Sequence, residues 1–301
     1  MKDEPFDFKT RLLLESQKVE RAILDFASQK PPAVPARLWE AMTYSLLAGG
    51  KRIRPFLVNA SGQVFGVSEE DSMILGLALE MIHTASLIHD DLPCMDDDVI
   101  RRGKATNHVV FGEALALLAG DALFLLGPCF AAEKLSQTRH LRSDRILEAV
   151  RVLLEAAGPS GICGGQTLDT DETEKTRTSP WRIAYWKTAV LFRACMMAPA
   201  FLGEASKEEL RLLSAFGSHL GIAFQIVDDI LDLLGEAKDL GKTPGKDAFQ
   251  DKNSFALRWG IETAREMAAD QTVRAKSALK GIRRDTKVLE GVASYLVSRG
   301  T

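Results

Sequence analysis

Five aspartates are crowded into one short stretch, Ser86 to Lys104, which reads SLIHDDLPCMDDDVIRRGK. Asp90 and Asp91 form a pair, and Asp96–Asp98 follow after four intervening residues. Carboxylates repel one another, so without a counter-ion such crowding would raise their pKa values or destabilise the fold. Carboxylates combined with substrate phosphates are the ligands that Mg²⁺ commonly takes in proteins. The stretch therefore predicts a site for a divalent cation.

A second acidic cluster, DDILD, holds Asp228, Asp229 and Asp232 within apolar sequence. Residues four apart share a face of a helix, so Asp228 and Asp232 point the same way. One such cluster is usually just a solvated helix face. The pair His89–Asp90 also resembles part of a metal phosphohydrolase site, but that chemistry needs further histidines, and the chain has only five. Two acidic clusters in apolar helices favour metal binding instead.

Basic residues accompany both clusters. They are Lys51, Arg52 and Arg54 in GGKRIRP, Arg101 and Arg102 in RRGK, Lys187 in YWKTAV, and Lys242, Lys246 and Lys252 after the second cluster. Each alone is typical of a surface loop. Together with the acids they predict a site for two polyanions, in which metals hold one diphosphate and Lys and Arg clamp both. A Walker-type glycine loop is missing from the sequence, which argues against a P-loop nucleotide site.

Long apolar segments with helical spacing carry these residues, for example MILGLALEMIHTASLIHDD and GIAFQIVDDILDLLG. Pro93 disfavours helical geometry at the residue before it, so the first helix should end just after Asp90 and Asp91. Ser179 with Pro180, and Ser206 with Glu209, indicate helix starts. Strand patterns are almost missing. We therefore predict an all-α protein whose central helices are buried on nearly every side.

Composition narrows the class of function. The chain has 301 residues, 46% of them hydrophobic, and a net charge of −3, which argues against nucleic acid as a partner. The four cysteines form no CxxC pair, as expected for reduced thiols in the cytoplasm. The start MKDEPFDFKT lacks an apolar core, so we expect no signal peptide. Charged residues interrupt the apolar runs, so we expect no membrane insertion.

Several segments carry a family resemblance: GGKRIRP, EMIHTASLIHDDLPCMDDDVIRRGK, GGQTLD, KTAVLFRA and GIAFQIVDDILD. In this order they resemble the trans-isoprenyl diphosphate synthases, which include farnesyl and geranylgeranyl diphosphate synthases. The two extra residues within DDLPCMD resemble the bacterial and plant branch. The resemblance implies an isoprenoid synthase-like helical bundle around a deep central cavity, one polyprenyl synthetase domain over residues 1–301, and a homodimer.

The implied activity is prenyl transfer. Isopentenyl diphosphate would condense with dimethylallyl, geranyl or farnesyl diphosphate by ionisation, condensation and elimination, with three Mg²⁺ ions on the allylic diphosphate. The family's metal ligands match Asp90, Asp91, Asp96 and Asp228, supported by Asp229 and Asp232. Its clamp on the allylic diphosphate matches Arg101, Lys187, Lys242 and Lys252.

The remaining matches concern the second substrate and the reacting carbon. The pocket for isopentenyl diphosphate matches Lys51, Arg54, His83 and Arg102. The positions beside the reacting carbon match Lys187, Thr188 and Gln225, and Gln166 and Asp169 match residues that orient the clamp. The chain departs from the family in GKDAFQDKNSFA, where Asp251 replaces a common glycine, so the contact of Lys252 with diphosphate is an open question.

Product length depends on the position five residues before Asp90, where relatives that stop at farnesyl usually carry an aromatic residue. Here it is Ala85, followed by Ser86. Five helical residues rise about 7.5 Å, so a small side chain there opens the floor beneath the diphosphate. We therefore expect geranylgeranyl diphosphate as product, with Phe124 or Met81 as a deeper stop.

Three alternatives stay open at this point. A farnesyl diphosphate synthase would share every motif. A class I terpene cyclase also ionises allylic diphosphates, yet it would not need GGKRIRP to hold a second diphosphate. A non-catalytic regulatory subunit would have lost aspartates from one motif, whereas both motifs are intact.

Overall fold

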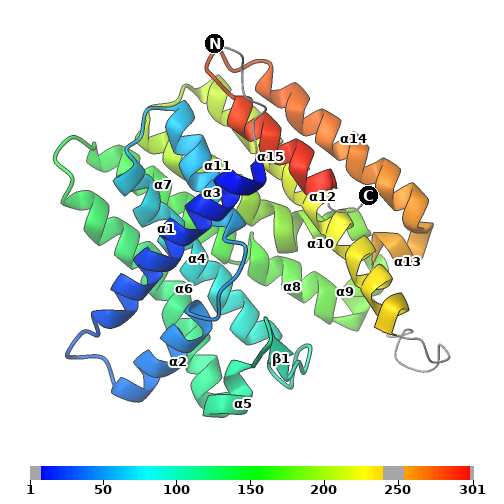
Figure 1. Cartoon of the computed structure of the whole chain (residues 1–301), viewed down its shortest axis with the longest axis horizontal. Coiled ribbons are helices and arrows are strands. Elements are labelled where there is room, and N and C mark those ends of the chain that lie inside the picture. Colours follow the sequence, from blue (N-terminus) through cyan, green and yellow to red (C-terminus); the bar gives the residue numbers. More distant parts are fainter. Residues whose placement is uncertain (1–7, 240–253, 299–301) are drawn as a thin grey trace. The chain divides into compact units, whose positions relative to one another are not determined.

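The computed structural model describes residues 8–239 and 254–298, and this part of the chain is helical apart from one short hairpin (Figure 1). The all-α prediction is confirmed. The elements are α1 (Phe8–Ser28), α2 (Ala36–Leu46), α3 (Ile53–Val64), α4 (Glu69–Asp90), β1 (Ile100–Arg101), β2 (Lys104–Ala105), α5 (Asn107–Phe111), α6 (Glu113–Ser136), α7 (Ser143–Ala157), α8 (Ile162–Thr170), α9 (Glu172–Arg177), α10 (Pro180–Ala184), a π-helix η1 (Tyr185–Ala189), α11 (Val190–Leu202), α12 (Lys207–Asp239), α13 (Phe255–Trp259), α14 (Ile261–Leu279) and α15 (Lys287–Ser298).

The chain divides into two compact units. The first comprises Met1–Ala157 with Cys195–Ala205, and the second comprises Gly158–Ala194 with Ser206–Thr301. Helix α11 begins in the second unit and ends in the first. The single domain expected over residues 1–301 stays a prediction.

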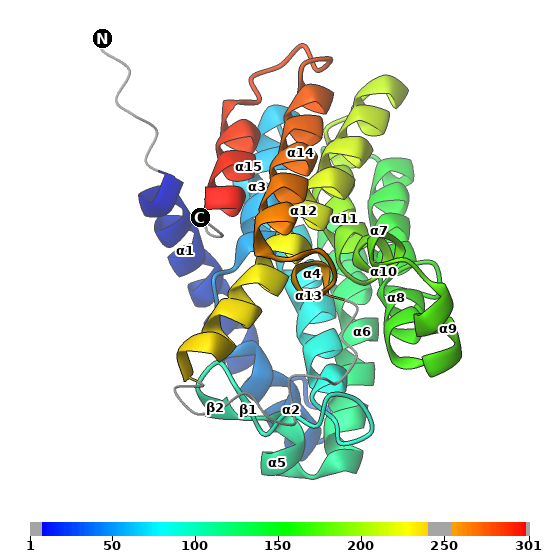
Figure 2. The same ribbon diagram turned by 90° about the vertical axis from the view of Figure 1, so that its right-hand side faces the viewer.

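Helices α4 and α6 pack side by side in the first unit, with α3 against α4 and α2 against α6 (Figures 1 and 2). Leu77, Met81, Ala85 and Ile88 recur at helical spacing along one face of α4 and belong to one buried cluster. The cluster also takes side chains from α1, α2 and α6: Val19, Ile23, Trp39, Ala41, Met42, Leu46, Ala116, Ala119 and Leu123. We call it the α4 cluster. Burying one of its large side chains stabilises the fold by about 1.5–3 kcal/mol.

Local signals set both ends of α4. The Ser68 side chain accepts a hydrogen bond from the backbone N–H of Asp71 at 3.0 Å, which caps the first turn. The helix ends at Asp90 with Asp91 as its C-cap, as Pro93 predicts. The loop then folds back, because the backbone N–H of Asp96 donates to the Asp90 carbonyl at 2.9 Å.

The hairpin after this loop is a feature that the sequence did not predict. Ile100 pairs with Ala105 and Arg101 with Lys104, and the turn between them uses positive φ at Arg102 and Gly103. Positive φ at both central residues is typical of a type I′ turn, whose twist matches that of a hairpin. Strands of two residues are too short to show the alternation of polar and apolar residues that predicts a strand, so the sequence carries no strand signal here.

In the second unit, α12 packs along α14 (Figure 2), and η1 contacts both α8 and α12. A buried cluster that includes Ile226, Ile230, Phe255 and Ala264 joins α12, α13 and α14. The capping box at the start of α12 is confirmed: the backbone N–H of Ser206 donates to the Glu209 carboxylate at 2.9 Å, and the Glu209 N–H donates back to Ser206 Oγ at 3.2 Å. Arg284, followed by Ser206, lowers the pKa of Glu209 to about 2.

Three helices of the described chain are long and apolar enough, by length and composition, to cross a membrane: Glu69–Asp90, Glu113–Ser136 and Lys207–Gly235. We expected none because charged residues interrupt the apolar runs, but each of these helices contains an apolar segment of 18 residues with at most two charged residues. Two thirds of that segment in α4 is buried inside the protein.

Candidate active site

The first aspartate motif lies where α4 ends. Asp91 is buried, Asp90 is half-buried, and Asp96–Asp98 are exposed. Arg101 Nε donates to Asp91 Oδ1 at 2.5 Å, and Arg101 Nη2 donates to Asp98 Oδ2 at 3.2 Å. Burial raises the pKa of Asp91, although the charge and the hydrogen bond of Arg101 oppose that rise. This hydrogen bond from Arg101 to Asp91 thus fixes the side chain of Arg101, which the sequence predicts to clamp the allylic diphosphate.

The donor chemistry of this motif fits magnesium. Within residues 8–239 and 254–298, no group of three or more Asp, Glu, His or Cys side chains is already arranged to hold a metal ion. The loop nevertheless brings the backbone of Asp96 against that of Asp90, and Asp96 is exposed to solvent. Mg²⁺ usually takes one or two protein carboxylates and completes its shell with water and substrate phosphate, so it does not need a cluster of three or more side chains.

A cluster of positive charge surrounds His83 on α4. The pKa of His83 lies well below its ordinary value, first because of burial and then because of the charges on Arg54, Arg102, Arg52 and Arg101. The imidazole is therefore neutral at pH 7, and the arginines around it form a field that attracts an anion. Three of the four residues predicted to bind isopentenyl diphosphate are thereby brought together, and Lys51, exposed, immediately precedes this arginine-rich segment.

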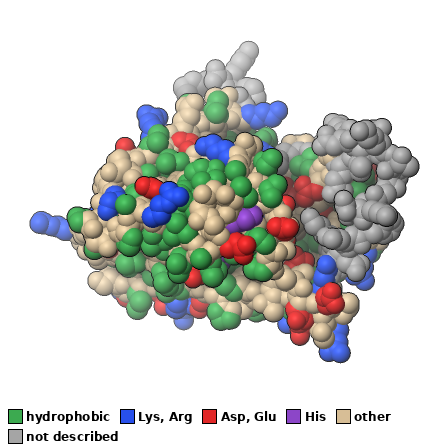
Figure 3. All heavy atoms as spheres, turned by 90° about the horizontal axis from the view of Figure 1, so that it is seen from below, with side chains coloured by type: hydrophobic (Ala, Val, Ile, Leu, Met, Phe, Trp, Pro, Cys, Tyr) green, Lys and Arg blue, Asp and Glu red, His purple; other side chains and the backbone are tan. Residues whose placement is uncertain are grey.

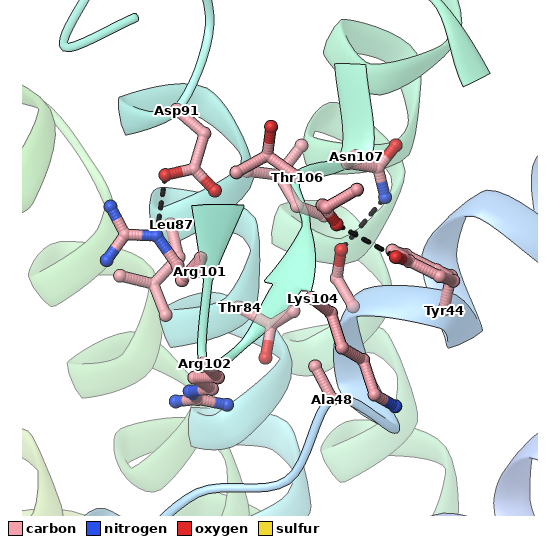
Figure 4. Close-up of a pocket in the computed structure, with 13 residues that line it drawn as sticks. Tyr44, Ala48, Thr84, Leu87, Asp91, Arg101, Arg102, Lys104, Thr106 and Asn107 are labelled. Atoms are coloured by element: carbon pink, nitrogen blue, oxygen red, sulfur yellow. Dashed lines mark hydrogen bonds and ion pairs between the residues drawn. The ribbon is translucent and has the colours of Figure 1, made fainter. Parts of the chain in front are cut away.

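A pocket that is partly open to solvent lies between α2, α4 and the hairpin (Figure 4). Asp91 and Arg101 meet at one end, and Arg102 and Lys104 lie toward the other (Figure 4). The buried Thr84 hydroxyl, in the pocket wall, has no hydrogen-bond partner among the described residues. Asp91 of the first aspartate motif and the basic hairpin thus line the same depression.

Lys187 and Thr188 lie in the π-helix η1 of the second unit. Single-turn π-helices are rare in proteins as a whole, and those that occur frequently lie at functional sites. Gly165 of α8 lets η1 approach, because a Cβ atom there would lie only 2.5 Å from Lys187 Cα. Lys187 Nζ donates to Asp169 Oδ2 at 2.6 Å, and both side chains are about one quarter exposed. The structure therefore places Asp169 beside Lys187, the predicted clamp lysine.

Thr188, Gln225 and Asp229 form a chain of hydrogen bonds. Thr188 Oγ1 donates to Gln225 Oε1 at 2.6 Å, and Gln225 Nε2 donates to Asp229 Oδ1 at 2.9 Å. The other oxygen of Asp229 accepts the backbone N–H of Phe255 at 2.7 Å. Burial raises the pKa of Asp229, against the hydrogen bonds that lower it. Asp229 thus orients Gln225 and fixes the start of α13, while Asp228, half-buried, and Asp232, exposed, lie nearby on α12.

The chain-length positions lie on α4. Ala85 is completely buried in the α4 cluster, together with Met81 one turn earlier, and Phe124 packs against the same cluster. Ser86 is half-buried, and its hydroxyl donates to the carbonyl of His83 at 2.8 Å. Gln166 is half-buried on α8. Lys242, Lys246 and Lys252 lie outside the described residues.

The family model for polyprenyl synthetase matches residues 35–292. The chain belongs to the polyprenyl synthetase family. It is 40% identical over 302 residues to a chloroplastic geranylgeranyl pyrophosphate synthase of Capsicum annuum, which covers 99% of this chain and 80% of that protein. It is 42% identical over 268 residues to farnesyl diphosphate synthase of Bacillus subtilis (strain 168), with 88% and 90% covered.

Solved structures agree with this membership. An apo crystal structure of an FPP/GFPP synthase from Zymomonas mobilis superposes with a TM-score of 0.81 at 35% identity, covering 97% of this chain and 99% of that chain. The protein is therefore a transferase of isoprenoid biosynthesis that elongates prenyl diphosphates. Magnesium dependence is general in the family. Product length is not fixed by the comparisons, because the relatives include both geranylgeranyl and farnesyl diphosphate synthases.

Proposed function

We propose that this prenyltransferase condenses isopentenyl diphosphate with an allylic diphosphate and that its main product is geranylgeranyl diphosphate. The observation that carries the product length is the small, buried Ala85, five residues before Asp90. The farnesyl diphosphate synthase of Bacillus subtilis, at 42% identity, keeps farnesyl diphosphate as the alternative product.

The reaction begins with cleavage of the allylic carbon–oxygen bond, so negative charge grows on the leaving diphosphate. Arg101 and Lys187 stabilise that charge more in the transition state than in the ground state. Three Mg²⁺ ions, when bound through Asp90, Asp91, Asp96 and Asp228, supply further neutralisation of the diphosphate. Asp91 keeps Arg101 in place by the 2.5 Å hydrogen bond, and Asp169 does the same for Lys187.

The second substrate is held by its own diphosphate. Lys51, Arg54 and Arg102 bind that group, and neutral His83 donates a hydrogen bond to it without adding charge. The double bond of isopentenyl diphosphate then attacks the cation, and a proton leaves to the departing diphosphate. Thr188 and Gln225 face the reacting carbon, and the bond of Gln225 to Asp229 fixes the side-chain orientation.

The product-length proposal is tested by chromatography of products made from isopentenyl diphosphate and each allylic primer. Wild-type protein should release geranylgeranyl diphosphate, and A85Y should stop at farnesyl diphosphate because the phenol blocks the growing chain. A tyrosine in a packed core costs about 1–3 kcal/mol, so A149Y, at a completely buried alanine of α7 outside the α4 cluster, controls for strain. Wild-type product ending at farnesyl, or an unchanged product in folded A85Y, would refute the assignment.

We also propose a cytoplasmic homodimer formed through α6. Leu117, Leu118 and Leu125 are 46%, 54% and 73% exposed on this helix. Figure 3 shows hydrophobic side chains gathered on the face of the protein seen from below. Soluble monomers seldom expose large contiguous apolar patches, so such a surface indicates an interaction site. A second copy that covers α6 would remove this surface from water.

A further inference from the structure

Arg52 lies between two residues assigned to isopentenyl diphosphate, yet its surroundings are different. Its side chain is completely buried, whereas Lys51 is exposed and Arg54 is half-buried. Nε donates to Glu20 Oε1 at 2.7 Å, Nη1 to Glu80 Oε1 at 2.5 Å, and Nη2 to the Leu46 carbonyl at 2.7 Å. Each nitrogen of the guanidinium already has an acceptor, so Arg52 is not a ligand for diphosphate.

These three contacts tie the loop before α3 to three helices. Glu20 lies on α1, Leu46 ends α2, and Glu80 lies on α4 with 2% of its side chain exposed. Glu80 and Glu20 outweigh the effect of burial, so the pKa of Arg52 lies above its ordinary value. Because a buried charge is tolerated only with its partners, the network holds the loop firmly.

The backbone shows what this network holds. Arg52 has φ 48° and ψ 38°, a left-handed conformation that side chains other than glycine rarely adopt. Gly49 and Gly50 also have positive φ, at 79° and 145°. This conformation turns the Arg52 side chain inward while Lys51, its neighbour, stays exposed. Without the three inward contacts, the strained backbone would have little reason to persist.

Arg102 packs on the other side of the same loop. Its guanidinium donates to the Gly49 carbonyl, and a Cβ atom on Gly50 would lie 2.9 Å from Arg102 Cζ. The loop conformation therefore also determines where Arg102 lies. Three assigned ligands, Lys51, Arg54 and Arg102, thus depend on one turn of backbone that the buried contacts of Arg52 maintain.

We propose that Arg52, Glu80 and Glu20 are positioning residues that fix loop Gly49–Arg52 so that it presents Lys51, Arg54 and Arg102 to isopentenyl diphosphate. The inference rests on the proposed function, which assigns those three ligands. The network touches no substrate. Its loss should weaken binding of isopentenyl diphosphate while the allylic site, with its own aspartate motif and Lys187, is unaffected.

The test is the double variant R52L/E80L, which removes the buried pair together and leaves no lone buried charge. Misplacing ligands by about 1 Å can cost up to about 100-fold, so we expect KM for isopentenyl diphosphate to rise at least about tenfold. KM for the allylic diphosphate should change less than about twofold. In E20A, which removes the half-exposed partner alone, KM for isopentenyl diphosphate should rise about two- to fivefold.

A matched control is E15L/N59L, which replaces another buried polar pair, Glu15 with Asn59 at 2.9 Å, between α1 and α3 of the same unit. It should lower the melting temperature to a similar extent and change neither KM. If R52L/E80L does not fold, E20A decides the proposal. An unchanged KM for isopentenyl diphosphate in a folded R52L/E80L, or in E20A in that case, overturns the positioning role.

The variant K51A distinguishes a failure of the positioning role from a failure of the proposed pocket for isopentenyl diphosphate. If K51A raises KM for isopentenyl diphosphate and the network variants do not, only the positioning role fails. If wild-type protein condenses both substrates but K51A leaves that KM unchanged, the assigned pocket is wrong, and the positioning role falls with it.

Discussion

At the scale of single residues, neighbours with similar side chains carry out different tasks. Arg52 is buried in an ion-pair network, while Arg54 belongs to the positive field around His83. Asp91 is buried and bonded to Arg101, while Asp96 is exposed to solvent. Burial and partners, which differ from one residue to the next, decide these roles.

His83 should make stability depend on pH. Its pKa in the folded protein lies well below the ordinary 6.5, so the unfolded chain binds a proton first as pH falls. Above about pH 6.5, His83 is neutral in the folded and the unfolded chain, and its burial does not depend on pH. Below that pH, protonation of the unfolded chain lowers the free energy of unfolding by up to about 1.4 kcal/mol per pH unit. Melting temperatures between pH 7.5 and 5 should fall more steeply in wild-type protein than in H83Q. Equal dependence of the melting temperature on pH in the two proteins would contradict the lowered pKa of His83.

At the scale of elements, glycines allow helices to approach and shape the site. Gly165 of α8 and Gly221 of α12 face η1 from two helices, and a Cβ atom on Gly221 would lie 2.8 Å from Ala189 Cβ. The π-helix is therefore confined on both sides, which fixes Lys187 beside Asp169 and Thr188 beside Gln225. The close packing of η1 is what aligns these polar side chains.

The variant G165A should disturb this alignment. Its methyl group meets the backbone of Lys187, which has no flexible side chain to yield, so we expect destabilisation of about 1–3 kcal/mol. Activity should fall at least about tenfold, because Lys187 moves relative to the allylic diphosphate. G235A is the control: among the described residues, no neighbouring atom outside its own helix backbone lies within 4 Å of its Cβ, so the change should stabilise the helix by about 0.5–1 kcal/mol. Thermal melting and turnover of both variants check this, and full activity in G165A would contradict it.

At the scale of the whole molecule, the proposed homodimer would account for the apolar exterior of α6. This helix is also long and apolar enough to cross a membrane, and 39% of its apolar segment of 18 residues is buried inside the protein. The chain is nevertheless a member of a family of prenyl diphosphate synthases, and an interface between copies gives its leucines an apolar neighbour without a bilayer.

The dimer is tested by L118E/L125E. Two carboxylates placed on this face would be forced out of water at the interface, so we expect monomers at micromolar concentration. Light scattering after size-exclusion chromatography should give twice the 33.0 kDa chain mass for wild-type protein and the chain mass for the variant. L147E, at an exposed leucine of α7, should leave the mass unchanged. Wild-type protein that elutes as a monomer would refute the proposal.

The sequence by itself determined the helices, the end of α4 at Asp90, the capping box of α12 and the two aspartate motifs, because periodicity and caps are local properties. Only the tertiary structure decided that Arg52 turns inward to Glu80, that Asp91 holds Arg101, and that Thr188 meets Gln225. Arg52 and Glu80 are separated by 28 positions, and a left-handed residue sets the direction of the side chain. Such contacts depend on how helices pack and on single backbone angles, and neither leaves a pattern in the order of the amino acids.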